Sequence, residues 1–156
     1  MGIYKGVWNL TRTFKGRVVL GGNVSGESIV THQGLNILAS YLKSLNDRNG
    51  KAICSDQNNK DLYNKDLAGK IICLPQTIGS TTGGMILQSV TELGIGPKAM
   101  LFSKHIDSLA AAGIILCYVW NNKKIVTIDQ LGDEFLEFVK DGQHIEISED
   151  GTVIVS

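Results

Sequence analysis

Short runs of β-branched and aliphatic residues, bounded by glycine or proline, predict several strands along this chain. The runs GRVVLGGNV (16–24) and GESIVT (26–31) indicate two strands joined by a tight glycine turn. GKIICLP (69–75) is apolar throughout and ends at a proline, a pattern typical of a strand buried on both faces. KAMLFS (98–103) and KKIVTID (123–129) predict two further strands.

Other segments carry apolar residues at helical spacing. In MILQSVTELG, the residues Ile86, Val90 and Leu93 recur on one helix face, and Gly94 follows as a C-terminal stop signal. The helices predicted in this way cover residues 34–45, about 82–93, 106–117 and 132–142, with an irregular packed segment as the alternative for 34–45.

The order of these elements predicts the fold class. Strand 69–74, helix 82–93 and strand 98–103 form a β-α-β unit, and such units place their two strands in parallel. The last segment, QHIEISEDGTVIVS, predicts an antiparallel hairpin, whereas the polar stretch 55–66 predicts a surface loop. The sequence therefore indicates one mixed α/β domain with a parallel central sheet and antiparallel additions at both ends.

The amino-acid composition argues against some classes of binding partner. The 156 residues carry 15 basic and 15 acidic side chains without a long block of either sign, which argues against nucleic acid or a membrane surface. The N-terminus lacks the apolar core of an export signal, and the longest apolar stretch, LAAAGIILCYVW, is too short to span a bilayer. We therefore expect a cytoplasmic protein without a membrane or nucleic-acid partner.

The three cysteines lie far apart and form no C-x-x-C pair. This spacing argues against a disulfide framework and against a zinc or iron–sulfur site held by this chain alone. Cys73 and Cys117 lie in apolar segments and are expected to be buried thiols. No metal or cofactor is therefore expected on this chain by itself.

The segment PQTIGSTTGG (75–84) joins a buried strand to a helix and is rich in hydroxyl groups and glycine. Ligands gather at such junctions because backbone amides and the helix dipole converge there. The segment has no lysine or arginine, so it does not match a Walker A phosphate loop. The structural alternative is that Ser80, Thr81 or Thr82 only caps the helix. Asp107 follows the strand 98–103, which ends on the same side of the sheet as this junction. The structural alternative for Asp107 is likewise that it only caps the following helix.

The histidines show no metal-ligand spacing. Phosphohistidine-carrier domains offer a comparison, because they have a glycine pair followed by a serine and the phospho-accepting histidine. Here the pair 21–22 is followed by Ser25, but the next residue is Gly26, so the acceptor is missing. A carrier function would have to use His32 or His105 instead.

Three stretches, taken in order, resemble the swivelling domain of aconitase X, which is the small subunit or a fused domain of a group of hydro-lyases. They are KGRVVLGGNVSGESIVTHQGLN, DLYNKDLAGKIICLPQTIGSTTGG with its G-S-x-T-G turn, and GPKAMLFSKHIDSLAAAGII. The resemblance covers residues 14–156 as a single domain and leaves residues 1–13 as an N-terminal extension.

The resemblance implies a three-layer β/β/α fold that pairs with a large catalytic subunit carrying an iron or iron–sulfur centre. In this family the first serine of the G-S-x-T-G turn transfers the proton at the active site, and it corresponds to Ser80. The substrate-binding residues expected around it are Gly79, Thr81, Thr82, Gly83 and Gly84, and the expected site wall is Ser25 and Asp107.

Family members dehydrate small hydroxy acids, and the known activities concern cis-3-hydroxy-L-proline and a phosphorylated mevalonate. Many relatives have arginine or lysine just before the G-S pair, whereas Thr77 and Ile78 stand there in this chain. Because phosphate sites favour cations, this difference favours cis-3-hydroxy-L-proline, with phosphomevalonate as the alternative. The chain is expected to be inactive without its large subunit. A hypothesis of another class is a non-catalytic binding module with the same fold.

Overall fold

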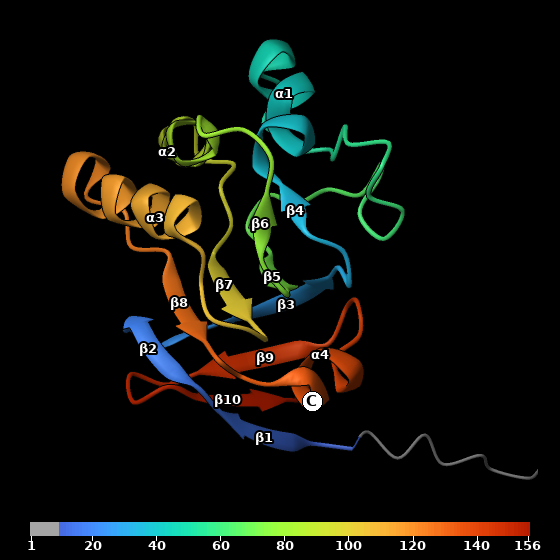
Figure 1. The fold of residues 1–156 in the computed structure, drawn as a ribbon, viewed down its shortest axis with the longest axis vertical. Helices are drawn as coiled ribbons and strands as arrows, with labels where there is room; N and C mark the ends of the chain where they lie inside the picture. The colour runs from blue at the N-terminus through green and yellow to red at the C-terminus, as the bar shows by residue number, and fades with distance from the viewer. Residues whose placement is uncertain (1–9) are drawn as a thin grey trace, which may run out of the picture.

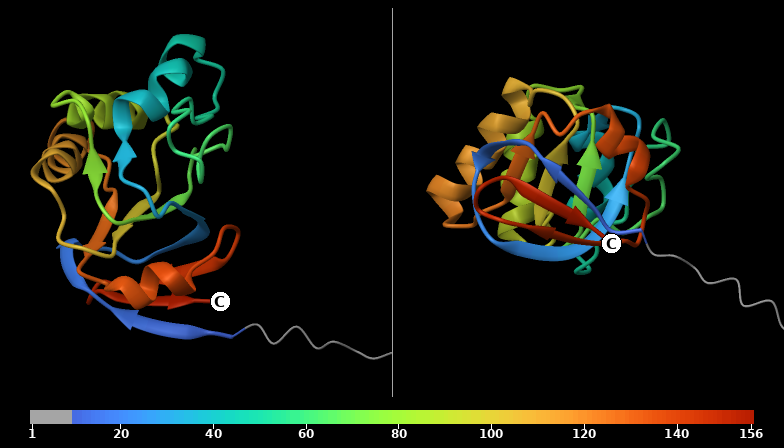
Figure 2. Two further views of the ribbon diagram at one scale, coloured as in Figure 1. Left: turned by 45° about the vertical axis from the view of Figure 1, so that its right-hand side comes forward. Right: turned by 90° about the horizontal axis from the view of Figure 1, so that it is seen from below.

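The computed structural model describes residues 10–156, which form three layers (Figures 1 and 2). In chain order the elements are β1 (Arg12–Lys15), β2 (Arg17–Leu20), β3 (Val24–Val30), β4 (Leu35–Asn36), α1 (Ile37–Asp47), β5 (Ile71–Leu74), β6 (Thr77–Ile78), α2 (Gly83–Glu92), β7 (Ala99–Phe102), α3 (Ser108–Asn121), β8 (Val126–Asp129), α4 (Asp133–Phe138), β9 (His144–Ile147) and β10 (Thr152–Val155).

Eight strands form one sheet in the order β1-β10-β9-β3-β5-β7-β8-β2, and β4 and β6 form a separate two-stranded sheet. Strands β3, β5, β7 and β8 are parallel and make up the middle layer. Strand β3 also belongs to the lower layer, because its first half pairs antiparallel with β9 while its second half pairs with β5. The lower layer therefore consists of β1, β10 and β9, and helix α4 lies beside it (Figure 1).

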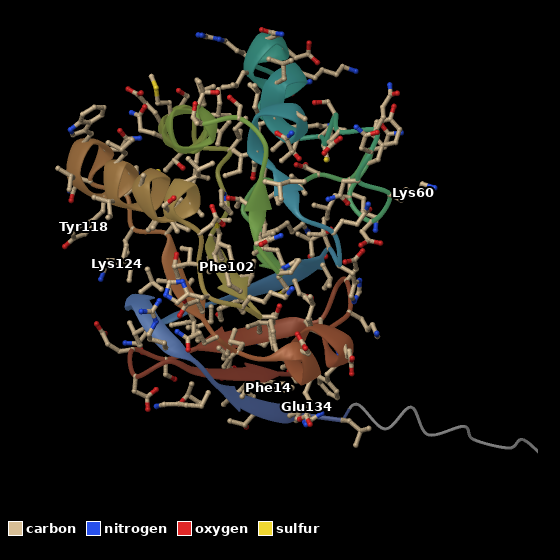
Figure 3. All side chains as sticks on the ribbon, in the orientation of Figure 1. Phe14, Lys60, Phe102, Tyr118, Lys124 and Glu134 are labelled. Atoms are coloured by element: carbon tan, nitrogen blue, oxygen red, sulfur yellow. The ribbon has the colours of Figure 1, made fainter. Side chains whose placement is uncertain are left out.

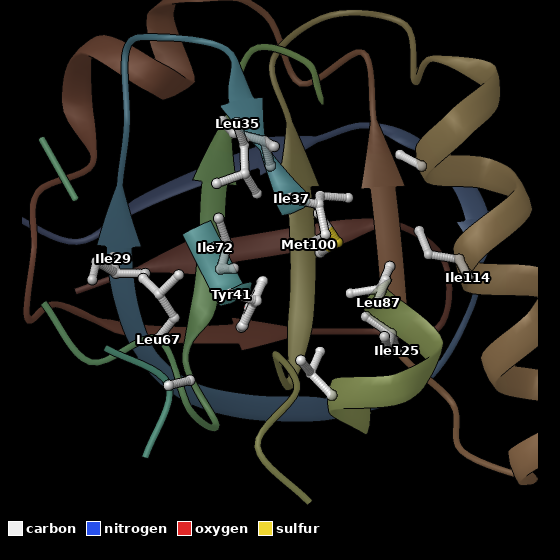
Figure 4. Close-up of a cluster of buried hydrophobic side chains, with 14 of the residues drawn as sticks. Ile29, Leu35, Ile37, Tyr41, Leu67, Ile72, Leu87, Met100, Ile114 and Ile125 are labelled. Carbon is white, nitrogen blue, oxygen red and sulfur yellow. The ribbon is translucent and has the colours of Figure 1, made fainter. Parts of the chain in front are cut away.

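Helices α1, α2 and α3 form the third layer above the parallel strands (Figure 1). Alternate residues of each central strand face this layer, for example Ile72 on β5 and Met100 on β7, both fully buried. They pack against helix residues such as Tyr41, Leu87 and Ile114 (Figure 4). This packing explains why the central strands have no polar face in the sequence.

The other residues of the same strands face the lower layer. Ile71 and Cys73 of β5 belong to a second buried cluster, together with Ile145 and Val153 of the terminal hairpin. Phe135 on α4 lies in this cluster as well. One sheet thus separates two cores, as expected for a three-layer β/β/α domain.

The structure confirms the predicted β-α-β unit, since β5 and β7 run parallel in the register Ile71 to Ala99. The terminal hairpin is confirmed too. The tight glycine turn predicted between the first two strands lies at residues 21–23, but β2 and β3 are not neighbours in the sheet. Strand β2 instead pairs antiparallel with β8 at the far end of the sheet. A pattern of glycines marks the turn between two strands, but it does not say which strand each of them will pair with.

Three short strands were not predicted. Strand β1 begins at Arg12, inside the range expected to be an extension, while residues 1–9 of that range lie outside the described residues. Strands β4 and β6 have two residues each and pair in parallel with one another. Elements of this length carry too few residues for a periodic pattern. No helix within residues 10–156 is long and apolar enough to cross a membrane.

Candidate functional site

The turn between β6 and α2 carries the residues expected to form the site. After β5 the chain passes Pro75, forms β6 alongside β4, and then turns through residues 79–82 into α2 (Figure 1). The turn therefore lies in the helix layer, beyond the carboxyl ends of the parallel strands. Ile78 and Met85 on either side of it are exposed.

The Ser80 side chain lies within this turn and is half-buried. Its Oγ atom lies 2.8 Å from Oγ1 of Thr82 and accepts a hydrogen bond from the Thr82 amide at 3.2 Å. The Gly83 amide donates to the Ser80 carbonyl at 3.1 Å, so the Oγ contact with the amide two residues on has the geometry of a side-chain cap on the turn that leads into α2. Thr82 occupies the cap position of α2, and its side chain makes no capping hydrogen bond. The structural alternative therefore agrees with the bonds of Ser80, which caps this turn, whereas the Thr82 side chain makes no capping hydrogen bond.

Gly79 determines how the turn approaches its neighbour Asn36. The backbone of Gly79 has φ of +95°, which side chains other than glycine rarely adopt. A Cβ atom there would also lie 2.5 Å from Nδ2 of Asn36. Asn36 caps helix α1, since its Oδ1 atom accepts a hydrogen bond from the Ala39 amide at 3.1 Å. The cap of α1 and the turn before α2 are thus in direct contact.

Asp107 connects the segment before the turn to helix α3. One of its oxygens accepts a hydrogen bond from the Thr77 amide at 2.8 Å, and the other accepts from the Thr77 hydroxyl. The carboxylate also caps α3 through the Ala110 amide at 3.1 Å. Asp107 therefore lies near the turn, but both of its oxygens are engaged in holding β6 against the start of α3.

The expected site residues that follow Ser80 differ in their exposure to solvent. Thr81 and Thr82 are exposed at the turn, and the amide of Gly83 donates to the Ser80 carbonyl at 3.1 Å. Gly84 is buried and lies against α3, where its Cβ atom would be 3.1 Å from the Gly113 nitrogen. It lets the two helices approach closely and faces away from solvent.

Ser25 is not brought to this turn. It pairs with Glu146 in the first half of β3, and its carbonyl accepts a hydrogen bond from Lys98 Nζ at 2.9 Å. This part of β3 precedes the pairing of Ser28 with Ile71, so Ser25 lies at the amino end of the parallel strands. The Ser80 turn follows the opposite, carboxyl end.

The two histidines considered for a carrier function have engaged rings. His32 contacts the Leu136 carbonyl through Nε2 at 3.2 Å and lies 3.6 Å from Asp61. Nδ1 of His105 lies 2.7 Å from the Ile106 carbonyl, so it carries the proton and donates to that oxygen. Its Nε2 atom lies 3.3 Å from the Arg17 guanidinium.

The thiols are buried, as expected for Cys73 and Cys117. Burial raises the pKa of Cys73 well above its ordinary value, which keeps the group a neutral thiol. Within residues 10–156 no group of three or more His, Cys, Asp or Glu side chains is placed to hold a metal ion.

Comparison with known proteins shows to which family this chain belongs. The model of the aconitase X swivel domain matches residues 13–155. This chain belongs to the aconitase X swivel domain family.

Relatives of this swivel domain agree with the assignment. The phosphomevalonate dehydratase small subunit of Methanocella arvoryzae is 27% identical over 88% of this chain and 92% of its own length. The protein of the same name from Thermococcus gammatolerans is 31% identical over 65% of this chain and 72% of its own length. The crystal structure of Thermococcus kodakaraensis aconitase X in its holo-form superposes with a TM-score of 0.77 at 25% identity, covering 93% of this chain and 98% of that chain.

Sequence reasoning missed Asn36 and Thr77 as neighbours of the site. Asn36 stands before an amphipathic run, which is a signal for a helix cap. Its contact with Gly79 depends on the two-residue pairing of β4 with β6, over 40 residues apart, for which the sequence has no signal.

Proposed function

We propose that this swivel domain is the small subunit of an aconitase X-type dehydratase, with Ser80 as the proton acceptor. The single observation that carries the proposal is the Gly79–Ser80 turn, which this family member has directly before α2, with Ser80 Oγ 2.8 Å from the Thr82 hydroxyl. A large partner subunit would complete the site, and the chain is expected to be inactive alone. An iron centre on that subunit would supply a Lewis acid for the departing hydroxyl group.

The surroundings of Ser80 suit a proton acceptor. A serine hydroxyl is a weak base in water, so its deprotonated form needs nearby donors. Ser80 Oγ already receives one hydrogen bond from the Thr82 amide, and the Thr82 hydroxyl can donate a second. The positive end of the α2 dipole lies at the same place. Because Ser80 is half-buried, a partner surface over the turn would remove the remaining water.

For the substrate we propose a phosphorylated mevalonate, the activity for which the two cited relatives are named. One observation favours cis-3-hydroxy-L-proline as a second candidate: residues 75–84 contain no lysine or arginine that could bind a phosphate. If the substrate is phosphorylated, the cation must therefore come from the partner subunit or from another part of this chain.

The test is a dehydration assay of this chain assembled with its large subunit, comparing the natural chain with Ser80→Ala. Loss of the proton acceptor should lower kcat at least about 100-fold. Ser89→Ala is the matched control, because Ser89 lies on α2, the helix that follows the turn, and its hydroxyl donates to the Met85 carbonyl. This control should keep full activity.

Co-purification with the large subunit and thermal unfolding would show that both variants remain assembled and folded. If an assembled Ser80→Ala complex kept its activity, the serine would have no catalytic role, and a non-catalytic binding module would be the better description. Offering phosphomevalonate and cis-3-hydroxy-L-proline side by side decides between the two substrates.

A further inference from the structure

A pocket in the described residues lies at the end of the parallel sheet opposite the Ser80 turn. Its volume is about 610 Å³, within the usual range for sites that bind small molecules. The segments that line it lead into three parallel strands: residues 22–24 into β3, 96–98 into β7 and 123–126 into β8. Thr91 at the C-terminal end of α2 and Gly94 just beyond it also line the pocket.

Positive charge is concentrated in this pocket, although the chain as a whole is neutral. Lys98, Lys123 and Lys124 line it, against one carboxylate, Glu149. Among the ion pairs formed within residues 10–156, none involves these three lysines or Glu149. The three lysines therefore line one cavity, and none of them is paired with Glu149 or with another carboxylate of the described residues.

The contacts that these lysines do make leave donors available. Lys98 uses one N–H on the Ser25 carbonyl, so two of its three donors are not used by that bond. Lys124 lies 5.9 Å from the ring centre of Tyr118, and the two side chains lie on the same side of the molecule in Figure 3. Its ammonium group is attracted by the ring face but makes no ion pair there. Lys123 is exposed.

We propose that this pocket binds a small molecule carrying phosphate groups. Lysine binds phosphate as a point charge, and several lysines around one concave surface raise the local concentration of anions. The volume exceeds what a single phosphate needs, which points to a di- or polyphosphate or to a phosphorylated metabolite. This inference is independent of the proposed dehydratase activity, because the pocket lies at the opposite end of the strands from Ser80.

The test uses inorganic pyrophosphate as the probe and the full chain at physiological salt, with binding measured by calorimetry. The natural chain should bind the probe saturably, and Lys123→Gln/Lys124→Gln should weaken binding at least about tenfold. The matched control is Lys51→Gln/Lys60→Gln, which removes the same charge from exposed loops. Lys60 lies on the other side of the molecule from Lys124 in Figure 3. This control should bind as the natural chain does.

Three results would overturn the proposal. The first is no heat of binding by a natural chain that is folded by circular dichroism, which would mean that the lysines only balance the carbonyl ends of α2 and α3. The second is an equal loss in both lysine pairs, which would indicate unspecific attraction. The third is equally tight binding of citrate, which would exclude a preference for phosphate. Chemical shift changes of the Gly22, Gly94 and Gly96 amides on adding pyrophosphate would support the location.

Discussion

At the scale of single residues, the buried carboxylate of Asp129 is kept in its charged form by the donors around it. Its side chain is completely buried, yet it receives hydrogen bonds from Arg17 at 2.9 and 2.6 Å and from the Ile106 amide at 2.8 Å. Burial alone would raise the pKa of this carboxyl group, but the Arg17 and Ile106 donors and the charge of Arg17 hold the pKa below its usual value. The ion pair ties β2 to β8 and to the segment before α3.

Replacing Asp129 by Asn should reduce the free energy of unfolding by about 2 kcal/mol near neutral pH, because charged hydrogen bonds are lost. The folded pKa lies below the unfolded value of about 3.9, so the stabilisation by the carboxylate is present above that pH. It is lost as the pH falls through the folded pKa. Urea unfolding of both proteins between about pH 2 and 7 should show the difference at neutral pH shrinking below about pH 4. A constant difference across this range would contradict the assignment to the charge of Asp129.

At the scale of elements, α2 and α3 approach each other through glycine. A Cβ atom on Gly113 would lie 2.9 Å from the Gly84 Cα atom and 3.1 Å from Leu87 Cδ2. Since the first of these atoms is backbone, the helices would have to separate to make room. The close approach matters for the candidate site because α2 begins at the Ser80 turn and α3 begins at Asp107.

Gly113→Ala should therefore lower the free energy of unfolding by about 2 kcal/mol, even though alanine favours a helix by about 1 kcal/mol over glycine. Gly83→Ala is the matched control. Its Cβ atom would meet Ile37 at an ordinary 3.7 Å, so this variant should be as stable as the natural chain or slightly more stable. Thermal unfolding of both variants is the measurement, and a Gly113→Ala protein as stable as the control would show that the helices can separate without cost.

At the scale of the whole molecule, β1 closes the lower layer. It pairs with β10 along four residues, and Phe14 reaches the second core, where its ring centre lies 5.3 Å from that of Phe135. Arg12 stacks over the Phe14 ring and pairs with Glu134 on α4 at 2.8 Å (labelled in Figure 3). Strand β1 therefore lies in the same layer as the terminal hairpin.

Phe14→Ala should cost about 3 kcal/mol of stability, because a buried aromatic ring is removed from a packed core. Leu10→Ala, in the residues just before β1, should change stability by less than about 0.5 kcal/mol, because Leu10 is 70% exposed. Urea denaturation with a common slope would measure both. Similar losses for the two variants would argue that β1 does not pack as described.

Whether the sequence predicts a structural feature depends on how far apart in the chain the residues that form it are. The helices and the central strands could be predicted, because burial imposes a period on every residue of a long element. The Ser80 turn could be located too, since glycine and hydroxyl residues between a strand and a helix are a local signal. The loop 55–66 was predicted to lie on the surface, yet Asn59 is 2% exposed and bonds to Thr31. The polar composition of a segment does not show which of its side chains will be buried in hydrogen bonds to other parts of the chain.

The sequence by itself determined the α/β class, the parallel β-α-β unit, the terminal hairpin and, through its motifs, the family. Only the tertiary structure decided that β2 pairs with β8, that Asp107 holds Thr77, and that Ser25 and Ser80 lie at opposite ends of the sheet. The physical reason is the same in each case. Propensity and periodicity act between near neighbours in the chain, whereas these contacts join residues far apart in sequence and depend on how the layers pack as a whole.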